Sequence, residues 1–290
     1  MSNSWDPIDT LHRGFDRVVA IYLVDTPDGP ALVDTGPTST LPAVEAALAA
    51  RGLALGDLRH LLLTHIHLDH AGASGTIVRR HPHIQVHVSE IGAPHVVDPS
   101  RLEKSARMLY LDEFDTLWGE LAPVPQENVH ALGSEVLGLE CFSAIGHAKH
   151  HVAFFGPDGT LYCGDSAGVR IEPARHIVAA SPPPDIDVEG WHRTIDELER
   201  RSPDRLCITH FGVKTDPADH LRRLRERLDL FAERIGSGMG LDEFVALDRA
   251  ELAAQGSDDA DLYERAGSLV QSHAGLSRYW TKRREREANA

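Results

Sequence analysis

Four side chains that can bind a metal ion lie within six residues of one another, and this cluster constrains the chain more than any other feature. The segment THIHLDH contains His65, His67, Asp69 and His70. Imidazole and carboxylate groups are the usual ligands of zinc and similar divalent ions. The segment follows the apolar run at 58–64, which predicts a strand buried on both faces. The sequence therefore predicts a metal site in the loop after this strand.

The spacing within the cluster favours two metal positions over one. His65 and His67 are two residues apart, so an extended segment turns both imidazoles to one side. Asp69 and His70 are adjacent and point in different directions as the chain turns into a helix. The chain has 18 histidines, so some clustering arises by chance. We interpret a second His-rich patch (81–87, with His81, His83 and His87) as surface or strand residues without a ligand role.

The hydrophobic pattern predicts two β-rich halves with helices between them. Strands are predicted at 17–25, 30–34, 58–64, 84–88, 128–131, 136–145, 151–156, 160–163 and 205–209. Helices are predicted at 40–51, 72–80, 99–122 and 187–201, and from about 216 to the end of the chain. This order indicates two sheets stacked face to face with helices outside. We expect an α/β catalytic domain at 1–215 and a C-terminal helical extension, 216–290, packed on it.

The helical stretch 99–122 is an insertion between the two halves. Leu111, Phe114, Trp118 and Leu121 fall at helical spacing and predict an apolar stripe. Two interpretations stay open. The stripe packs against the sandwich, or it forms a lid or pocket wall over the metals, since apolar and aromatic side chains line most small-ligand sites.

Five motifs, in order, resemble the metallo-β-lactamase superfamily over roughly residues 17–212. THIHLDHAG is similar to the family signature. The other four are LVDTG (32–36), GHAKHH (146–151), LYCGD (161–165) and ITHFG (208–212). The resemblance implies an αββα sandwich, which agrees with the two-halves pattern.

The resemblance also implies a two-metal site. One metal would be held by His65, His67 and His147, the other by Asp69, His70 and His210, with Asp165 bridging both. The cofactors implied are two divalent ions, zinc first, with iron or manganese as alternatives. A metal-bridged hydroxide would attack the substrate, and Asp69 and Asp165 are the predicted catalytic residues. No GxSxG element offers a serine nucleophile.

Residues around the implied ligands receive weaker assignments. Asp34 is interpreted as a carboxylate that orients a ligand imidazole, with a plain turn residue as the alternative. For His151, a place near the site and a packing role are equally supported. Lys149 and His150 replace the small residues that are common in the family.

The substrate is constrained less than the site. The ligand set resembles the glyoxalase II, lactonase and phosphodiesterase branches, but the tyrosine element of glyoxalase II is absent and Gly168 replaces a tyrosine common in lactonases. We predict hydrolysis of a small ester, thioester or lactone. The alternatives are a small phosphodiester hydrolase, a mononuclear-iron enzyme similar to persulfide dioxygenases, and a non-catalytic metal-binding protein.

Charge and cysteine content limit the partners. A net charge of −15 opposes nucleic-acid binding, and no apolar run approaches the length of a membrane span. The N-terminal segment lacks the pattern of a signal peptide. Cys141, Cys163 and Cys207 lie in apolar contexts that predict buried free thiols. We therefore expect a cytoplasmic protein that acts on a small molecule, with a homodimer left open.

Overall fold

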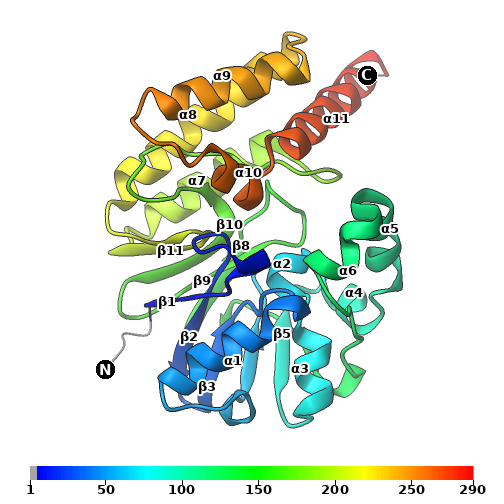
Figure 1. Ribbon diagram of the computed structural model, residues 1–290, viewed down its shortest axis with the longest axis vertical. Coiled ribbons are helices and arrows are strands. Elements are labelled where there is room, and N and C mark those ends of the chain that lie inside the picture. The colour runs from blue at the N-terminus through cyan, green and yellow to red at the C-terminus, as the bar shows by residue number, and fades with distance from the viewer. Residues whose placement is uncertain (1–4, 290) are drawn as a thin grey trace.

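A computed structural model describes residues 5–289 and contains two β-sheets packed face to face with helices on both outer sides (Figure 1). The first sheet has the order β1-β2-β3-β4-β5-β6. Its strands are β1 (Pro7–Asp9), β2 (Ala20–Thr26), β3 (Gly29–Val33), β4 (His60–Leu62), β5 (Gln85–Val88) and β6 (Val129–Ala131). The β1-β2-β3 pairs are antiparallel, and β3 to β6 run parallel.

The second sheet has the order β12-β11-β10-β9-β8-β7. Its strands are β7 (Glu135–Val136), β8 (Leu139–Ser143), β9 (Val152–Phe155), β10 (Thr160–Val169), β11 (Arg205–His210) and β12 (Gly212–Lys214). Only the β10–β11 pair in this sheet is parallel. The two stacked sheets confirm the αββα sandwich expected from the sequence.

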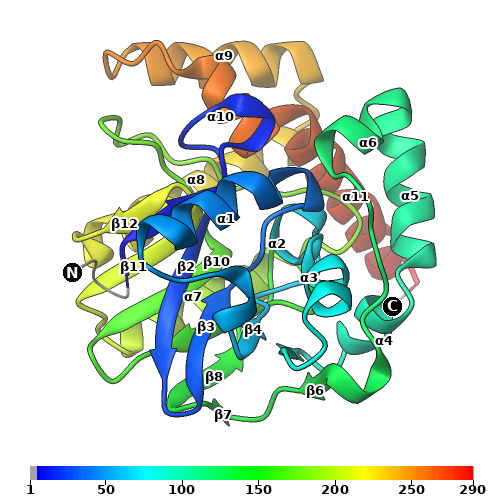
Figure 2. The same ribbon diagram turned by 60° about the horizontal axis from the view of Figure 1, so that its bottom comes forward.

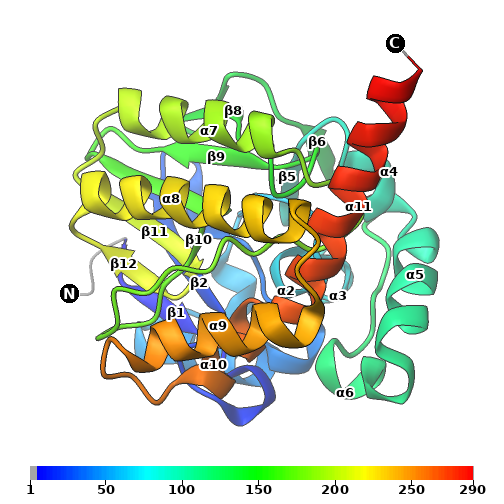
Figure 3. The same ribbon diagram turned by 90° about the horizontal axis from the view of Figure 1, so that it is seen from above.

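The helices cover the outer faces and one flank of the sandwich. The α-helices are α1 (Leu41–Ala50), α2 (Leu68–Ala71), α3 (Ser74–Arg80), α4 (Ala93–Val97), α5 (Ser100–Tyr110), α6 (Phe114–Leu117), α7 (Val188–Arg200), α8 (Pro217–Gly236), α9 (Leu241–Ala253), α10 (Ala260–Ala266) and α11 (Leu269–Ala288). Figure 2 shows α1 and α3 beside the first sheet, and Figure 3 shows α7 and α8 lying across the second. No helix within 5–289 combines the length and the apolar character that a bilayer crossing requires.

Strand alternation divides the apolar side chains between an inner and an outer core. In β2, Tyr22 and Val24 pack between the two sheets, whereas Ile21 packs on the opposite face beneath the helices. In β4, Leu62 faces the inner core and Leu61 the outer one. The period of two follows from strand geometry, and it orients every strand that leads into the site.

The C-terminal helices extend the outer core of the second sheet. The predicted face of α8 is buried there, with Leu221, Leu224, Leu228, Phe231 and Ile235. A buried contact positions α9, since His176 Nε2 lies 3.0 Å from a carboxylate oxygen of Asp248 in that helix. The extension therefore packs onto the sandwich through one continuous apolar cluster.

The insertion at 99–122 does not form the single continuous apolar stripe that the sequence predicts. Phe114 and Trp118 are buried in a small cluster with Leu68, the first residue of α2. Leu111, which we placed on the stripe, is 71% exposed. The cause is local: Leu111 has a φ of 48°, outside the helical region, and it ends α5 before α6 begins.

Candidate metal centre

The histidine-rich loop begins where β4 ends and runs into α2. His65 and His67 lie between β4 and the helix, with His67 in extended backbone, and Asp69 and His70 lie within the single turn of the helix. His147 follows β8, Asp165 lies within β10, and His210 ends β11. All seven predicted ligand positions therefore meet at one edge of the sandwich, although they come from both halves of the chain.

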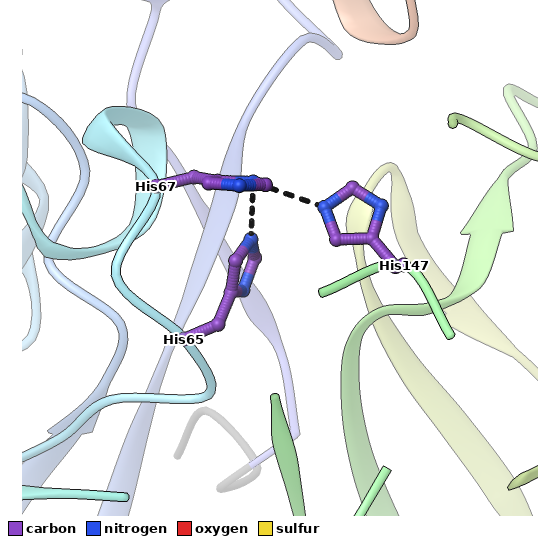
Figure 4. A group of neighbouring side chains, drawn as sticks. All are labelled: His65, His67 and His147. Atoms are coloured by element: carbon purple, nitrogen blue, oxygen red, sulfur yellow. Dashed lines mark hydrogen bonds between the residues drawn. The ribbon is translucent and has the colours of Figure 1, made fainter. Parts of the chain in front are cut away.

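Three histidines form the first group (Figure 4). His67 Nδ1 lies 2.9 Å from His65 Nε2 and 3.0 Å from His147 Nε2. The three nitrogen atoms converge on one point between the loop and the second half of the fold. This arrangement suits a cation with imidazole ligands.

A second group lies next to the first. It consists of Asp69, His70 and His210, whose ligand atoms are within 4.8 Å of one another. Asp69 Oδ2 lies 3.4 Å from His210 Nε2 and 3.8 Å from His70 Nε2.

Asp165 lies between the two groups and turns one oxygen toward each. Its Oδ1 is 3.3 Å from His70 Nε2 and 3.4 Å from His210 Nε2. Its Oδ2 is 3.4 Å from His147 Nε2. A single carboxylate thus faces nitrogen atoms of both groups.

Most of the imidazoles are held from outside by their second ring nitrogen. His70 Nδ1 lies 2.8 Å from Asp34 Oδ2, and His65 Nδ1 lies 3.1 Å from Thr64 Oγ1. His147 Nδ1 and His210 Nδ1 face backbone carbonyl oxygens, of Ala180 at 2.8 Å and Val18 at 2.6 Å. These contacts fix the ring orientations and leave each Nε2 directed into the site, as metal-ligating histidines require.

The unpaired polar atoms of the site indicate that these residues bind a cation. His70 Nε2 and Asp165 Oδ1 are buried and have no hydrogen-bond partner, although they lie close together. Buried polar atoms are normally paired, so two such orphans facing one point indicate an absent partner. Burial alone would raise the pKa of Asp165, but the imidazoles of His70 and His210 hold it well below its usual range. Burial also lowers the pKa of His65 and of His67, which favours the neutral, metal-binding form of both.

The structure gives the contacts of the residues that surround the predicted ligands. Asp34 contacts the imidazole of His70, one of the predicted ligands, and also accepts hydrogen bonds from Thr64. His151 belongs near the site: its ring stacks on His65, and its Nε2 accepts a hydrogen bond from the backbone N–H of Asp165. His150 stacks farther out on His65, and Lys149 pairs with Asp185.

Sequence reasoning missed Thr64 and the carbonyl groups of Ala180 and Val18. Thr64 lies inside the signature segment, so its position next to His65 was the available signal. Backbone carbonyl groups occur in every residue and gave none.

The chain belongs to the metallo-β-lactamase superfamily. The family model described as "Metallo-beta-lactamase superfamily" matches residues 14–210. The uncharacterized protein YobT of Bacillus subtilis is 27% identical over 215 residues, which are 71% of this chain and 88% of YobT.

Two further proteins are similar to this chain, one in fold and one in part of its sequence. The crystal structure of ST1585, an archaeal superfamily member from Sulfolobus tokodaii, matches with a TM-score of 0.65 at 19% identity and covers 95% of this chain and 97% of its own; this likeness is one of fold. A hydroxyacylglutathione hydrolase of Chromohalobacter salexigens is 28% identical over 153 residues, which are 52% of this chain and 48% of that enzyme.

Proposed function

We propose that the chain is a dinuclear metal-dependent hydrolase. The observation that carries the proposal is the position of Asp165, with one oxygen toward each group of nitrogen atoms. The proposed ligands are His65, His67 and His147 for one ion, Asp69, His70 and His210 for the other, and Asp165 for both. Zinc is the proposed ion, because imidazole and carboxylate sets suit it.

When bound, such a pair of ions would polarise a substrate oxygen and lower the pKa of water towards about 7. Asp165 faces nitrogen atoms of both groups, so its negative charge would lower the repulsion between two cations held there. Asp69 is the more accessible carboxylate, with 23% of its side chain exposed against 7% for Asp165. We therefore assign to Asp69 the transfer of a proton on the open side of the site.

An aromatic wall stands beside the metal-binding loop. The Trp118 ring stacks on His12 with centroids 5.4 Å apart and meets the edge of Tyr110 at 5.1 Å. Tyr110 Oη accepts a hydrogen bond of 3.0 Å from Gln271 Nε2 of α11, so the wall connects the insertion with the C-terminal extension. Trp118 also shares an apolar cluster with Leu68. We propose that these residues line the substrate pocket.

The wall and the charge of the chain support a small carbonyl substrate. Aromatic side chains would contact an apolar acyl or aryl group and shield the reaction from water. A net charge of −15 disfavours large polyanions. The relative named hydroxyacylglutathione hydrolase also supports an acyl substrate. We propose an ester, thioester or lactone, with a small phosphodiester as the second class.

The test compares metal-loaded and chelator-treated protein on thioesters, lactones and bis-aryl phosphates. Carbonyl substrates should be hydrolysed only by the loaded protein. The Asp165→Ala variant should lose metal, and its activity should fall by more than about 100-fold, because it lacks a direct ligand. Replacing a residue that only orients a ligand already lowers metal affinity or activity by about 10- to 100-fold. Hydrolysis that survives complete metal removal would overturn the proposal. A single iron with oxygen consumption on a persulfide would replace it with the dioxygenase alternative.

A further inference from the structure

Three histidines form a row on neighbouring strands away from the metal centre. His60 lies in β4, His87 in β5 and His130 in β6, and these strands are parallel neighbours. His60 Nδ1 lies 3.1 Å from His87 Nε2. The His130 ring stacks on His87 with centroids 5.2 Å apart, and its Nε2 lies 2.7 Å from the Gln85 side-chain oxygen.

The row is on the inner face of the first sheet. Leu61 and Val86 belong to the outer core, so the alternating positions His60 and His87 turn to the other face. His130 is the register partner of His87 and shares that face. Inner-face positions of a sandwich are normally apolar, as Leu62 is on the same strand as His60.

The row is also reachable from solvent. His60 and His87 are half-buried and His130 is exposed. Figure 2 shows β6 and β7 along one side of the molecule, where the two sheets reach their edges. The row thus replaces the apolar packing expected of the inner face with three imidazoles at an open margin.

We propose that this row is a second metal site, with His60 Nδ1 and His87 Nε2 as a chelating pair and His130 as a third ligand. The proposal reverses the interpretation from the sequence that His87 has no ligand role. Metal–nitrogen bonds of about 2.0–2.1 Å place two nitrogen ligands of one ion roughly 3–3.4 Å apart. The 3.1 Å separation fits this geometry and is similar to the spacings of 2.9 and 3.0 Å in the main centre. His130 would coordinate by rotating away from Gln85.

The donor set selects the kind of ion. Three imidazoles without a carboxylate suit Cu²⁺, Ni²⁺ or Zn²⁺, whereas Mg²⁺ and Ca²⁺ prefer oxygen ligands. An ion held here would join β4, β5 and β6, so its binding would stabilise the folded chain, by an amount that rises with the logarithm of the free ion concentration above the Kd.

The experiment measures bound zinc in the full-length protein by equilibrium dialysis and elemental analysis. Wild type is compared with His87→Ala and His60→Ala. The matched control is His83→Ala, which removes another surface imidazole whose Nε2 faces the carbonyl groups of Gly56 and Leu58. His87→Ala and His60→Ala should each lose one ion per chain while hydrolytic activity is unchanged. His130→Ala should lower the affinity of this second site for zinc by roughly tenfold. His83→Ala should bind as much zinc as wild type.

Equal zinc content in wild type and His87→Ala would overturn the proposal. Melting temperatures in excess chelator show whether each variant is folded, so a loss of zinc through unfolding is recognised. If His87→Ala unfolds, His87→Gln provides the same comparison. Because the measured quantity is a difference between variants, the result does not depend on how many ions the main centre holds.

Discussion

Asp34 should control metal affinity although it is not a proposed ligand. Its carboxylate contacts His70 Nδ1 at 2.8 Å and accepts hydrogen bonds from the backbone N–H and the hydroxyl of Thr64. An ionised Asp34 requires a proton on His70 Nδ1, and this leaves the Nε2 lone pair free for a metal. The Asp34→Asn variant can turn an amide N–H toward the imidazole, which favours the opposite tautomer and blocks Nε2.

The expected loss follows from one charge-assisted hydrogen bond. Such a bond contributes about 1.5–3 kcal/mol, which corresponds to about 10- to 150-fold in affinity. Asparagine is the suitable replacement because Asp34 has a φ of 60°, a conformation that asparagine tolerates. The assay is a competition titration of metal-free protein against a chromophoric chelator, with the melting temperature of the metal-free variant as a check of folding.

Asp158→Asn is the matched control for this prediction. Asp158 also accepts hydrogen bonds from a backbone N–H and a hydroxyl, both of Thr160, but it has no contact with the metal centre. Its replacement should leave metal affinity unchanged. An Asp34→Asn protein that binds metal as tightly as wild type would refute the argument.

Three further outcomes are expected. Trp118→Ala should change the ratio of kcat/KM between substrates at unchanged metal content; a lower melting temperature alone would make the residue a packing group. Gly164→Ala should weaken metal binding, because a Cβ there would lie 2.6 Å from Thr64 Oγ1 and 2.7 Å from His151 Nε2; unaltered affinity would contradict this. Burial lowers the pKa of His220 to about 4 from 6.5, so the unfolded chain binds the extra proton first and stability falls as pH drops from about 6.5 to about 4. At pH 5 the free energy of unfolding is lower by about 2 kcal/mol for this reason. Denaturant unfolding at pH 7 and pH 5 should show a smaller decrease for His220→Gln than for wild type. An equal decrease in both proteins would refute the assignment.

Elements with short-range signals were predictable from the sequence. The hairpin of β2 and β3 and the apolar face of α1 are present, with Leu41, Val44 and Leu48 buried as predicted. The metal-competent cluster at 65–70 was also visible, because its residues are adjacent in the chain.

Features that depend on unusual backbone were not predictable. The segment 136–145 was predicted as one strand, but it turns back on itself between β7 and β8. The turn has φ values of 51° at Leu137 and 83° at Gly138. Leucine rarely adopts a positive φ, so this hairpin lacks the residue pair that normally marks such a turn.

Strand length and long-range contacts also exceeded what local pattern conveys. The strand predicted at 160–163 continues to Val169, through register shifts on either side of Gly164. A glycine within an apolar run indicates a break as readily as an irregular strand. The contact between Tyr110 and Gln271 joins residues 161 positions apart, and no spacing rule brings them together.

The most direct test of the two-metal proposal is anomalous diffraction from crystals of the zinc-loaded protein. We expect two peaks on opposite sides of the Asp165 carboxylate. One peak should lie among His65, His67 and His147, and the other among Asp69, His70 and His210. A single peak, or two peaks that do not share Asp165, would contradict the dinuclear centre on which the proposed hydrolase rests.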